Sequence, residues 1–371
     1  MVERTDAVGR RIAAARERGG LTQQELAGSA GMERSALAKI ERGLRGVAAL
    51  ELAAIAKALD VRLEWFLSDG PATIASHRTR AAADVELSII DDRLERLARD
   101  VELVCSWDGG LLGARVTPRP VPSSGPAADL LGAEARALCG LDASAPVLDL
   151  VAALAAIGLL AFSAPLGAET ADAATTLLDR GGVALVNSTG MVGRRRLALA
   201  HELGHFLIAD DYTVDWRVAE PSGAGRTEPL LDRFARAFLA PGLALTELWS
   251  ETRRHHDLRT SAVLATSHFR VDMSTLARRL AELDLASAAE CAIVRSTRTT
   301  RADIIEHGLA VPYDLEGVTL PRPYERAVLA LYREERVSAE RALSLLLGTL
   351  DAEDLPELRP THRAEIWSVI S

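Results

Sequence analysis

A proline-rich stretch at residues 117–126 is the feature that most limits how this chain can fold. It holds four prolines among ten residues. Because proline has no amide hydrogen and a fixed φ angle, neither a helix nor a strand can run through it. Separate segments must therefore fold on either side. At 371 residues, and with roughly 150 residues in an average domain, we expect two or three domains.

Composition and charge are those of a folded globular protein. Apolar residues make up 48% and charged residues 26% of the chain, which argues against a disordered or fibrous protein. The net charge of -9 argues against indiscriminate nucleic-acid binding, although it leaves room for a local site. The first residues lack a basic start and an apolar signal segment, so we expect a soluble, cytoplasmic protein with no membrane partner.

Residues 1–70 carry the pattern of a small all-helical domain. Apolar residues recur at the i, i+3 and i+4 spacing of helices, and Gly31 and Gly43 lie where helices should stop. Residues 71–126 then read as a connection between domains. Within it we expect a longer helix over 82–104, followed by the proline-rich linker.

The chain beyond the linker reads as mostly helical with a few buried strands. Apolar runs at 158–163 and 183–187 are typical of buried strands. Helical spacing is found in the other segments, namely 127–139, 147–157, 194–209, 243–250, 260–266, 274–283 and 325–348. We predict a mainly α fold with a small β-sheet, an α+β arrangement. Its central domain is expected at 127–285, and residues 286–371 form a mostly helical C-terminal region of unknown role.

The segment His201-Glu202-Leu203-Gly204-His205 is an HExxH motif inside an apolar helical run. Residues four apart on a helix lie one above the other, so both imidazoles can reach a single zinc ion. The Glu202 carboxylate can hold and deprotonate a water at the open position of such a site. The motif therefore predicts a zinc-dependent hydrolase with Glu202 as its catalytic base. A chance match on a buried helix is the alternative, expected in on the order of one chain in a hundred.

A catalytic zinc site needs a third protein ligand, and acidic residues downstream of the motif can supply it. Glu228 is the ligand that we predict. Asp232 follows four residues later on the same helical face, where it can hydrogen-bond the second nitrogen of a ligating histidine. Glu220 and Asp232 itself are the alternative third ligands.

Residues from about 147 to 241 resemble the ImmA/IrrE family of zinc metallopeptidases, which belongs to the gluzincin group. The resemblance rests on a strand ending at Asn187, on the run from Arg195 through the HExxH motif, and on residues 232–241, which are similar to the family's closing helix. It implies a zinc-dependent metalloendopeptidase that acts on a protein. The two motif histidines and Glu228 would bind the metal.

Residues 21–43 resemble the helix-turn-helix of the Xre/lambda-repressor-like family. Thr22 can cap a first helix, and Gly31 permits the sharp turn into a second one. The resemblance implies that the second helix lies in the major groove of double-stranded DNA. The residues then expected to contact DNA are Gln23 at the backbone and Glu33, Arg34, Ser35 and Lys39 at base edges or phosphates.

Two main hypotheses about function follow. In the first, the chain is a transcriptional regulator that binds an operator, as a homodimer, and its peptidase domain cleaves a protein such as a repressor. In the second, the metal site is vestigial or structural and the chain acts only as a transcription factor. Glu202 favours the first hypothesis, because a purely structural metal site needs no base. An antitoxin-like role is a third alternative, on which the sequence is neutral.

Overall fold

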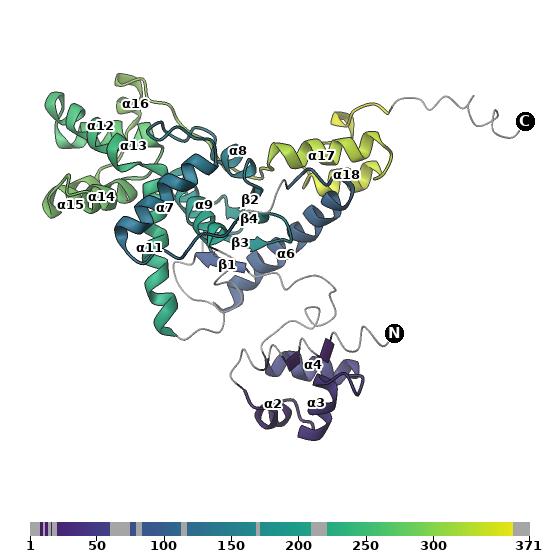
Figure 1. The fold of residues 1–371 in the computed structure, drawn as a ribbon. Coiled ribbons are helices and arrows are strands. Elements are labelled where there is room, and N and C mark those ends of the chain that lie inside the picture. The colour runs from purple at the N-terminus through teal and green to yellow at the C-terminus, as the bar shows by residue number, and fades with distance from the viewer. Residues whose placement is uncertain are drawn as a thin grey trace, which may run out of the picture. The chain divides into compact units, whose positions relative to one another are not determined.

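The computed structural model describes residues 8–9, 12–13, 16, 21–59, 75–78, 84–112, 117–167, 171–208 and 221–358. The chain forms two compact units (Figure 1). The N-terminal unit comprises Met1–Ile74 and Asp210–Arg226, and the sheet unit comprises Ala75–Ala209 and Thr227–Ser371. Within the described ranges, no helix combines the length and the apolarity needed to cross a bilayer.

The N-terminal unit packs short helices around one small core. These helices are α2 (Gln23–Ser29), α3 (Arg34–Glu41) and α4 (Ala49–Ala58). Thr22 begins α2 through a capping box with Glu25, and Gly31, at φ 66°, makes the turn before α3. The core consists of Ile12, Leu26, Ala27, Leu37, Ile40, Leu52, Ile55 and Ala56. The helical fold predicted for this part of the chain is confirmed.

A small mixed sheet lies at the centre of the other unit. Its strands are β1 (Ala75–Arg78), β2 (Leu159–Ala164), β3 (Ala173–Leu177) and β4 (Gly182–Asn187), in the order β1-β3-β4-β2. Strands β2 and β4 are parallel, with Leu159 opposite Gly182, and the other two pairs are antiparallel. Beyond β2, a bridge between Ser163 and Thr319 covers part of the sheet edge.

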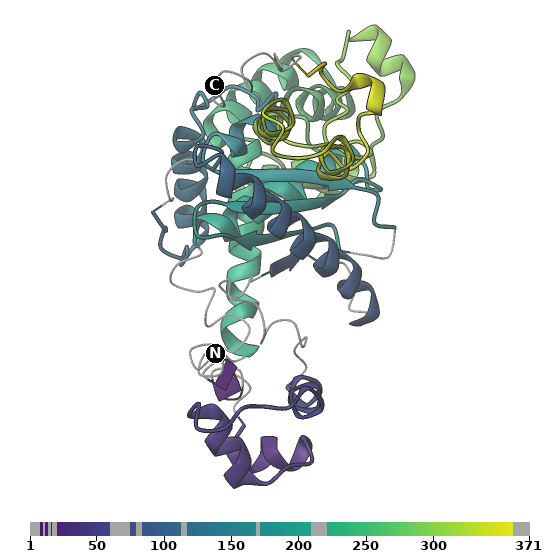
Figure 2. The ribbon, with the colours of Figure 1, turned by 90° about the vertical axis from the view of Figure 1, so that its right-hand side faces the viewer.

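Helices cover both faces of this sheet (Figure 2). Leu159 and Ala161 belong to the core shared with α9 (Val192–Leu207), whereas Leu160 and Phe162 belong to the core shared with α6 (Asp84–Trp107). This alternation follows from the two-residue period of a strand. Because both of their faces are buried, the parallel strands β2 and β4 read in the sequence as largely apolar runs.

The other helices of this unit surround the two cores. They are α7 (Gly125–Leu138), α8 (Leu150–Ala155), α11 (Pro221–Leu239, of which the part from Thr227 onward belongs to this unit), α12 (Gly242–His255), α13 (Leu258–Phe269), α14 (Met273–Glu282), α15 (Ala288–Ser296), α16 (Arg301–Glu306), α17 (Arg322–Arg333), α18 (Ala339–Leu345) and the short 3-10 helix η1 (Ala352–Asp354). The predicted mainly α fold with a small sheet is confirmed. The single helix expected over 325–348 is wrong, because Glu335, at φ 57°, ends α17 and Ser338 caps a new helix.

Helix α6 and the proline-rich stretch, expected from the sequence to connect two domains, both pack against the sheet unit. Ile90, Leu94 and Val101 of α6 are fully or almost fully buried in the core that includes the sheet. In the proline-rich stretch, the Arg119 amide donates to the Leu207 carbonyl oxygen at the end of α9. These contacts attach both segments to the sheet unit. The domain boundaries drawn from the sequence stay a prediction.

Candidate functional site

Helix α9 holds both histidines of the HExxH motif in the interior of the sheet unit. Every residue from Arg195 to Leu207 is buried. Phe206 packs beside Gly182 at the start of β4, and Gly204 lies against Phe234 of α11. The helix is therefore enclosed between the sheet and α11, which explains why the motif is flanked by apolar residues.

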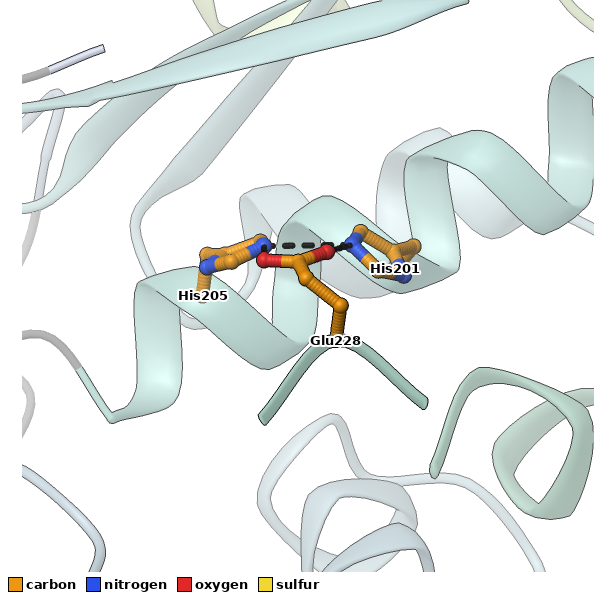
Figure 3. Close-up of side chains that lie close together, drawn as sticks. All are labelled: His201, His205 and Glu228. Atoms are coloured by element: carbon orange, nitrogen blue, oxygen red, sulfur yellow. Dashed lines mark hydrogen bonds and ion pairs between the residues drawn. The ribbon is translucent and has the colours of Figure 1, made fainter. Parts of the chain in front are cut away.

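His201, His205 and Glu228 bring three ligand atoms together (Figure 3). His201 Nε2 lies 3.1 Å from His205 Nε2 and 3.1 Å from Glu228 Oε2, and His205 Nε2 lies 3.5 Å from Glu228 Oε1. A tetrahedral zinc ion with bonds of about 2.05 Å keeps its ligand atoms about 3.3 Å apart. One oxygen of Glu228 faces each histidine, and one ligand atom from each of the three residues lies within 4.8 Å of the other two, so the donor set fits zinc. No second group of this kind is found among the described residues.

Asp232 contacts the other ring nitrogen of His201. Its Oδ1 lies 3.0 Å from His201 Nδ1, so that an N–H at Nδ1 donates to the carboxylate and Nε2 is left to bind a metal. Burial lowers the pKa of His201, but its hydrogen bonds to Asp232 and Glu228 outweigh this and raise the pKa to about 9. Burial opposes the charged form of Glu228 too and so raises its pKa. The hydrogen bonds to His201 and His205 are stronger than this effect and hold the pKa of Glu228 well below its usual range.

The three candidates for the third ligand thus occupy different places. Glu228 joins the two histidines, whereas Asp232 lies on the far side of the His201 ring. Glu220 lies outside the described residues. Glu202, the predicted base, is completely buried, and its charge also contributes to the raised pKa of His201.

The turn of α11 that carries Glu228 has an unusual composition. Pro229 lies inside the helix, directly after the candidate ligand. Since proline cannot donate a main-chain hydrogen bond, this turn lacks one of the bonds that normally hold a helix together. The position of Glu228 must therefore depend on what the rest of α11 contacts.

The predicted DNA-contacting residues lie in the helix-turn-helix. Glu33, Arg34, Ser35 and Lys39 are exposed on or next to α3. Gln23 is different, because its Nε2 donates to Glu41 Oε2 at 2.7 Å. Hence α3 offers an exposed polar surface, while Gln23 takes part in contacts within the unit.

Glu41 is the centre of those contacts. It is 7% exposed and pairs with Arg16, whose Nε lies 2.7 Å from its Oε1. A buried ion pair of this kind joins the end of α3 to the residues before α2. It leaves Glu41 with a structural role.

Comparisons with protein families found two matches, on separate parts of the chain. Residues 12–66 match the helix-turn-helix family. Residues 155–281 match a metallopeptidase family described as the IrrE N-terminal-like domain. The chain is a fusion of these two domain types. Searches of curated proteins and of solved structures found no match.

The IrrE-like domain includes strands β2, β3 and β4 and all three residues of the candidate metal group. Helices α6, α17 and α18 lie outside the matched range, although they complete the core on the second face of the sheet. The helix-turn-helix domain includes α2, α3 and α4. The matched regions thus contain the candidate metal group and the exposed polar residues of α3.

Sequence patterns did not reveal the charged residues that hold α11 in place. Asp129 of α7 and Arg279 of α14 are bonded to each other, 150 positions apart in the chain. In the sequence, each of these two residues is a charge on an otherwise apolar helical face. Asp129 lies near the buried Ala128 and Leu131, and Arg279 lies near the buried Leu276 and Leu280. Such a charge predicts a buried partner, but it does not say which one.

Proposed function

We propose that this chain is a DNA-binding transcriptional regulator whose IrrE-like domain is a zinc-dependent metallopeptidase. His201, His205 and Glu228 are the proposed ligands. The observation that carries the proposal is that two imidazole nitrogens and a carboxylate oxygen lie within 4.8 Å of one another, with His201 Nε2 3.1 Å from both His205 Nε2 and Glu228 Oε2, close to the edge length of a tetrahedral zinc site.

The remaining residues of the site have separate roles in this proposal. A bound zinc ion supplies Lewis acidity that polarises the peptide carbonyl group. Glu202 takes a proton from the attacking water and passes it to the leaving amine. Asp232 accepts the Nδ1–H of His201 and so fixes the ring with Nε2 directed toward His205 and Glu228.

The DNA-binding half of the proposal rests on the exposed residues of α3. In a helix-turn-helix the second helix enters the major groove, where Arg34 and Ser35, in the first turn of α3, would meet base edges. Glu33 and Lys39 would flank them. We propose a homodimer on a palindromic operator, with a protein, such as a repressor, as the substrate of the peptidase domain.

Replacing the base tests the enzymatic half. Glu202→Gln should keep the metal and lose cleavage, because an amide cannot accept the proton of water. The probe is a library of peptides from a digested proteome, incubated with the zinc-loaded chain, and the measurement is the appearance of new amino termini. New termini with the parent and none with Glu202→Gln support the proposal. Equal cleavage by both proteins would refute the role of Glu202 as the base, and no cleavage by the parent would favour a transcription factor with a structural metal site.

A further inference from the structure

Five charged residues hold the second half of α11 between α7 and α14. We call this group the α11 clamp. Its members are Asp129 of α7, Arg233 and Arg236 of α11, and Arg279 and Glu282 of α14. All of them are at least partly buried, at 27%, 23%, 7%, 2% and 16% side-chain exposure respectively. These pairs are therefore less screened by water than ordinary surface ion pairs.

The hydrogen bonds of the clamp form a continuous chain. Asp129 Oδ2 accepts from Arg233 Nη2 at 2.7 Å, and Asp129 Oδ1 accepts from Arg279 Nη1 at 2.7 Å. Glu282 accepts from Arg236 Nε at 2.8 Å and from Arg279 Nη1 at 3.2 Å. Three helices that are distant in sequence are thus joined through alternating charges.

Arg279 also fixes the end of α11. Its Nε donates to the carbonyl oxygen of Ala240, the residue after Leu239. From α7, Arg136 Nη1 donates to the carbonyl oxygen of Phe238 at 2.7 Å. Because these are main-chain acceptors, the bonds restrain the axis of α11 as well as the side chains on it.

The clamp lies close in sequence to the residues of the metal site. Arg233 directly follows Asp232 and comes five positions after Glu228. At about 1.5 Å of rise per residue, this separation along the helix axis is about 8 Å. Pro229 removes a main-chain hydrogen bond to the preceding turn of α11, so the main chain at Glu228 depends more on the following turn, which carries Arg233. A displacement of about 1 Å at such a site is enough to disturb its chemistry.

We infer that Asp129, Arg233 and Arg279 are positioning residues of the metal site: they fix α11 so that Glu228 reaches His205 and His201, and Asp232 reaches His201 Nδ1. This inference rests on the proposed zinc-binding function. It assigns to the clamp a role in metal affinity that a merely stabilising ion pair would not have.

Arg233 is the best member to replace. Without Arg233, Asp129 still accepts from Arg279, so no buried charge loses its last partner. Arg233→Lys is the conservative variant. The matched control is Arg259→Ala, because Arg259 makes a similar two-bond pair, 2.8 Å from each oxygen of Asp303, and has no bond to α11. Both alanine variants lose one positive charge.

The first readout is zinc affinity of the full chain. We expect Arg233→Ala to weaken zinc binding by about 10- to 100-fold, as is usual when a residue that supports a metal ligand is removed. Arg233→Lys should recover part of this loss. Arg259→Ala should bind zinc like the parent, and a zinc affinity that falls equally in both alanine variants would overturn the inference.

The second readout needs no metal. In chains stripped of metal, amide hydrogen exchange of residues 227–232 should be faster by on the order of tenfold in Arg233→Ala and unchanged in Arg259→Ala. Unchanged exchange in Arg233→Ala, or faster exchange spread over the whole unit, would overturn the inference. A parent chain that binds no zinc refutes the proposed function instead, while the exchange experiment still decides whether the clamp positions Glu228.

Discussion

Gly204 sets the distance between the two helices of the metal site. It stands between the motif histidines, and a Cβ atom at this position would lie 2.9 Å from Phe234 Cδ1 and 3.1 Å from Leu231 Cδ2. Both neighbours belong to α11 and are fully buried. A side chain at residue 204 would therefore push α11, with Glu228 and Asp232, away from the histidines.

Gly204→Ala should destabilise the sheet unit by about 1–3 kcal/mol, the usual cost of an extra methyl group in a filled core. It should also weaken zinc binding. The measurements are urea unfolding and zinc titration. Gly28→Ala is the control, because nothing lies within 4 Å of the corresponding Cβ atom in α2, so alanine should be neutral or slightly stabilising there. Unchanged stability and zinc affinity in Gly204→Ala would contradict this account of the helix spacing.

Secondary structure with a strong periodic pattern could be predicted from the sequence. The helix expected over 194–209 is α9 (Val192–Leu207), and the strand expected over 183–187 is β4 (Gly182–Asn187). Strand β3 was missed because Ala-Ala-Thr-Thr-Leu has neither an apolar run nor a clear alternation. Its strand conformation comes from pairing with β4, a tertiary effect that a local pattern does not contain.

Arg196 connects α9 to three distant segments of the unit. Its side chain is completely buried, and it donates to Val147 O at 2.5 Å, to Asp314 Oδ2 at 2.9 Å and to Arg270 O at 3.1 Å. Burial lowers the pKa of Arg196 below its ordinary value, and the carboxylate of Asp314 offsets only part of this effect. Arg196 thus ties α9 to its neighbours, as the α11 clamp ties α11 to α7 and α14.

Arg196→Ala should lower the free energy of unfolding by about 3–5 kcal/mol, because it leaves buried acceptors without their donor. The free energy of unfolding of Arg196→Lys should lie between those of Arg196→Ala and the parent, since one ammonium group cannot reproduce the planar guanidinium fork. Urea unfolding measures both. Arg99→Ala, which removes an exposed ion pair with Glu95, should change stability by less than about 0.5 kcal/mol. An Arg196→Ala variant as stable as Arg99→Ala would contradict the prediction.

The candidate residues of the metal site could be predicted from the sequence, whereas the charged residues around α11 could not. His201, Glu202 and His205 are visible because one helix turn brings them together. Glu228 is predicted because a catalytic zinc site needs a third ligand, and Asp232 because it follows four residues later on the same helical face. The contacts of Asp129 and Arg233, 104 positions apart, depend on how helices pack, and a single sequence does not record that. The two domain types can also be tested separately.

Arg34→Ala should weaken binding to a specific operator by about 1–3 kcal/mol if this side chain reads a base edge, and leave zinc content unchanged. The operator is first selected from random DNA with the full chain, and binding is measured at several salt concentrations. Lys57→Ala, an exposed lysine on α4, is the control for loss of one positive charge. Equal affinity of Arg34→Ala and the parent would show that α3 does not read DNA through this residue.

The metal content of the purified chain tests the proposed zinc site without any need to know the substrate or the operator. We expect about one zinc per chain, and its loss in His201→Ala and in His205→Ala, because the two remaining ligands form an incomplete site. Glu228→Ala should lose the metal for the same reason. Full retention of zinc in all three variants, or a parent chain that holds no zinc after loading, would contradict the metal site proposed for His201, His205 and Glu228.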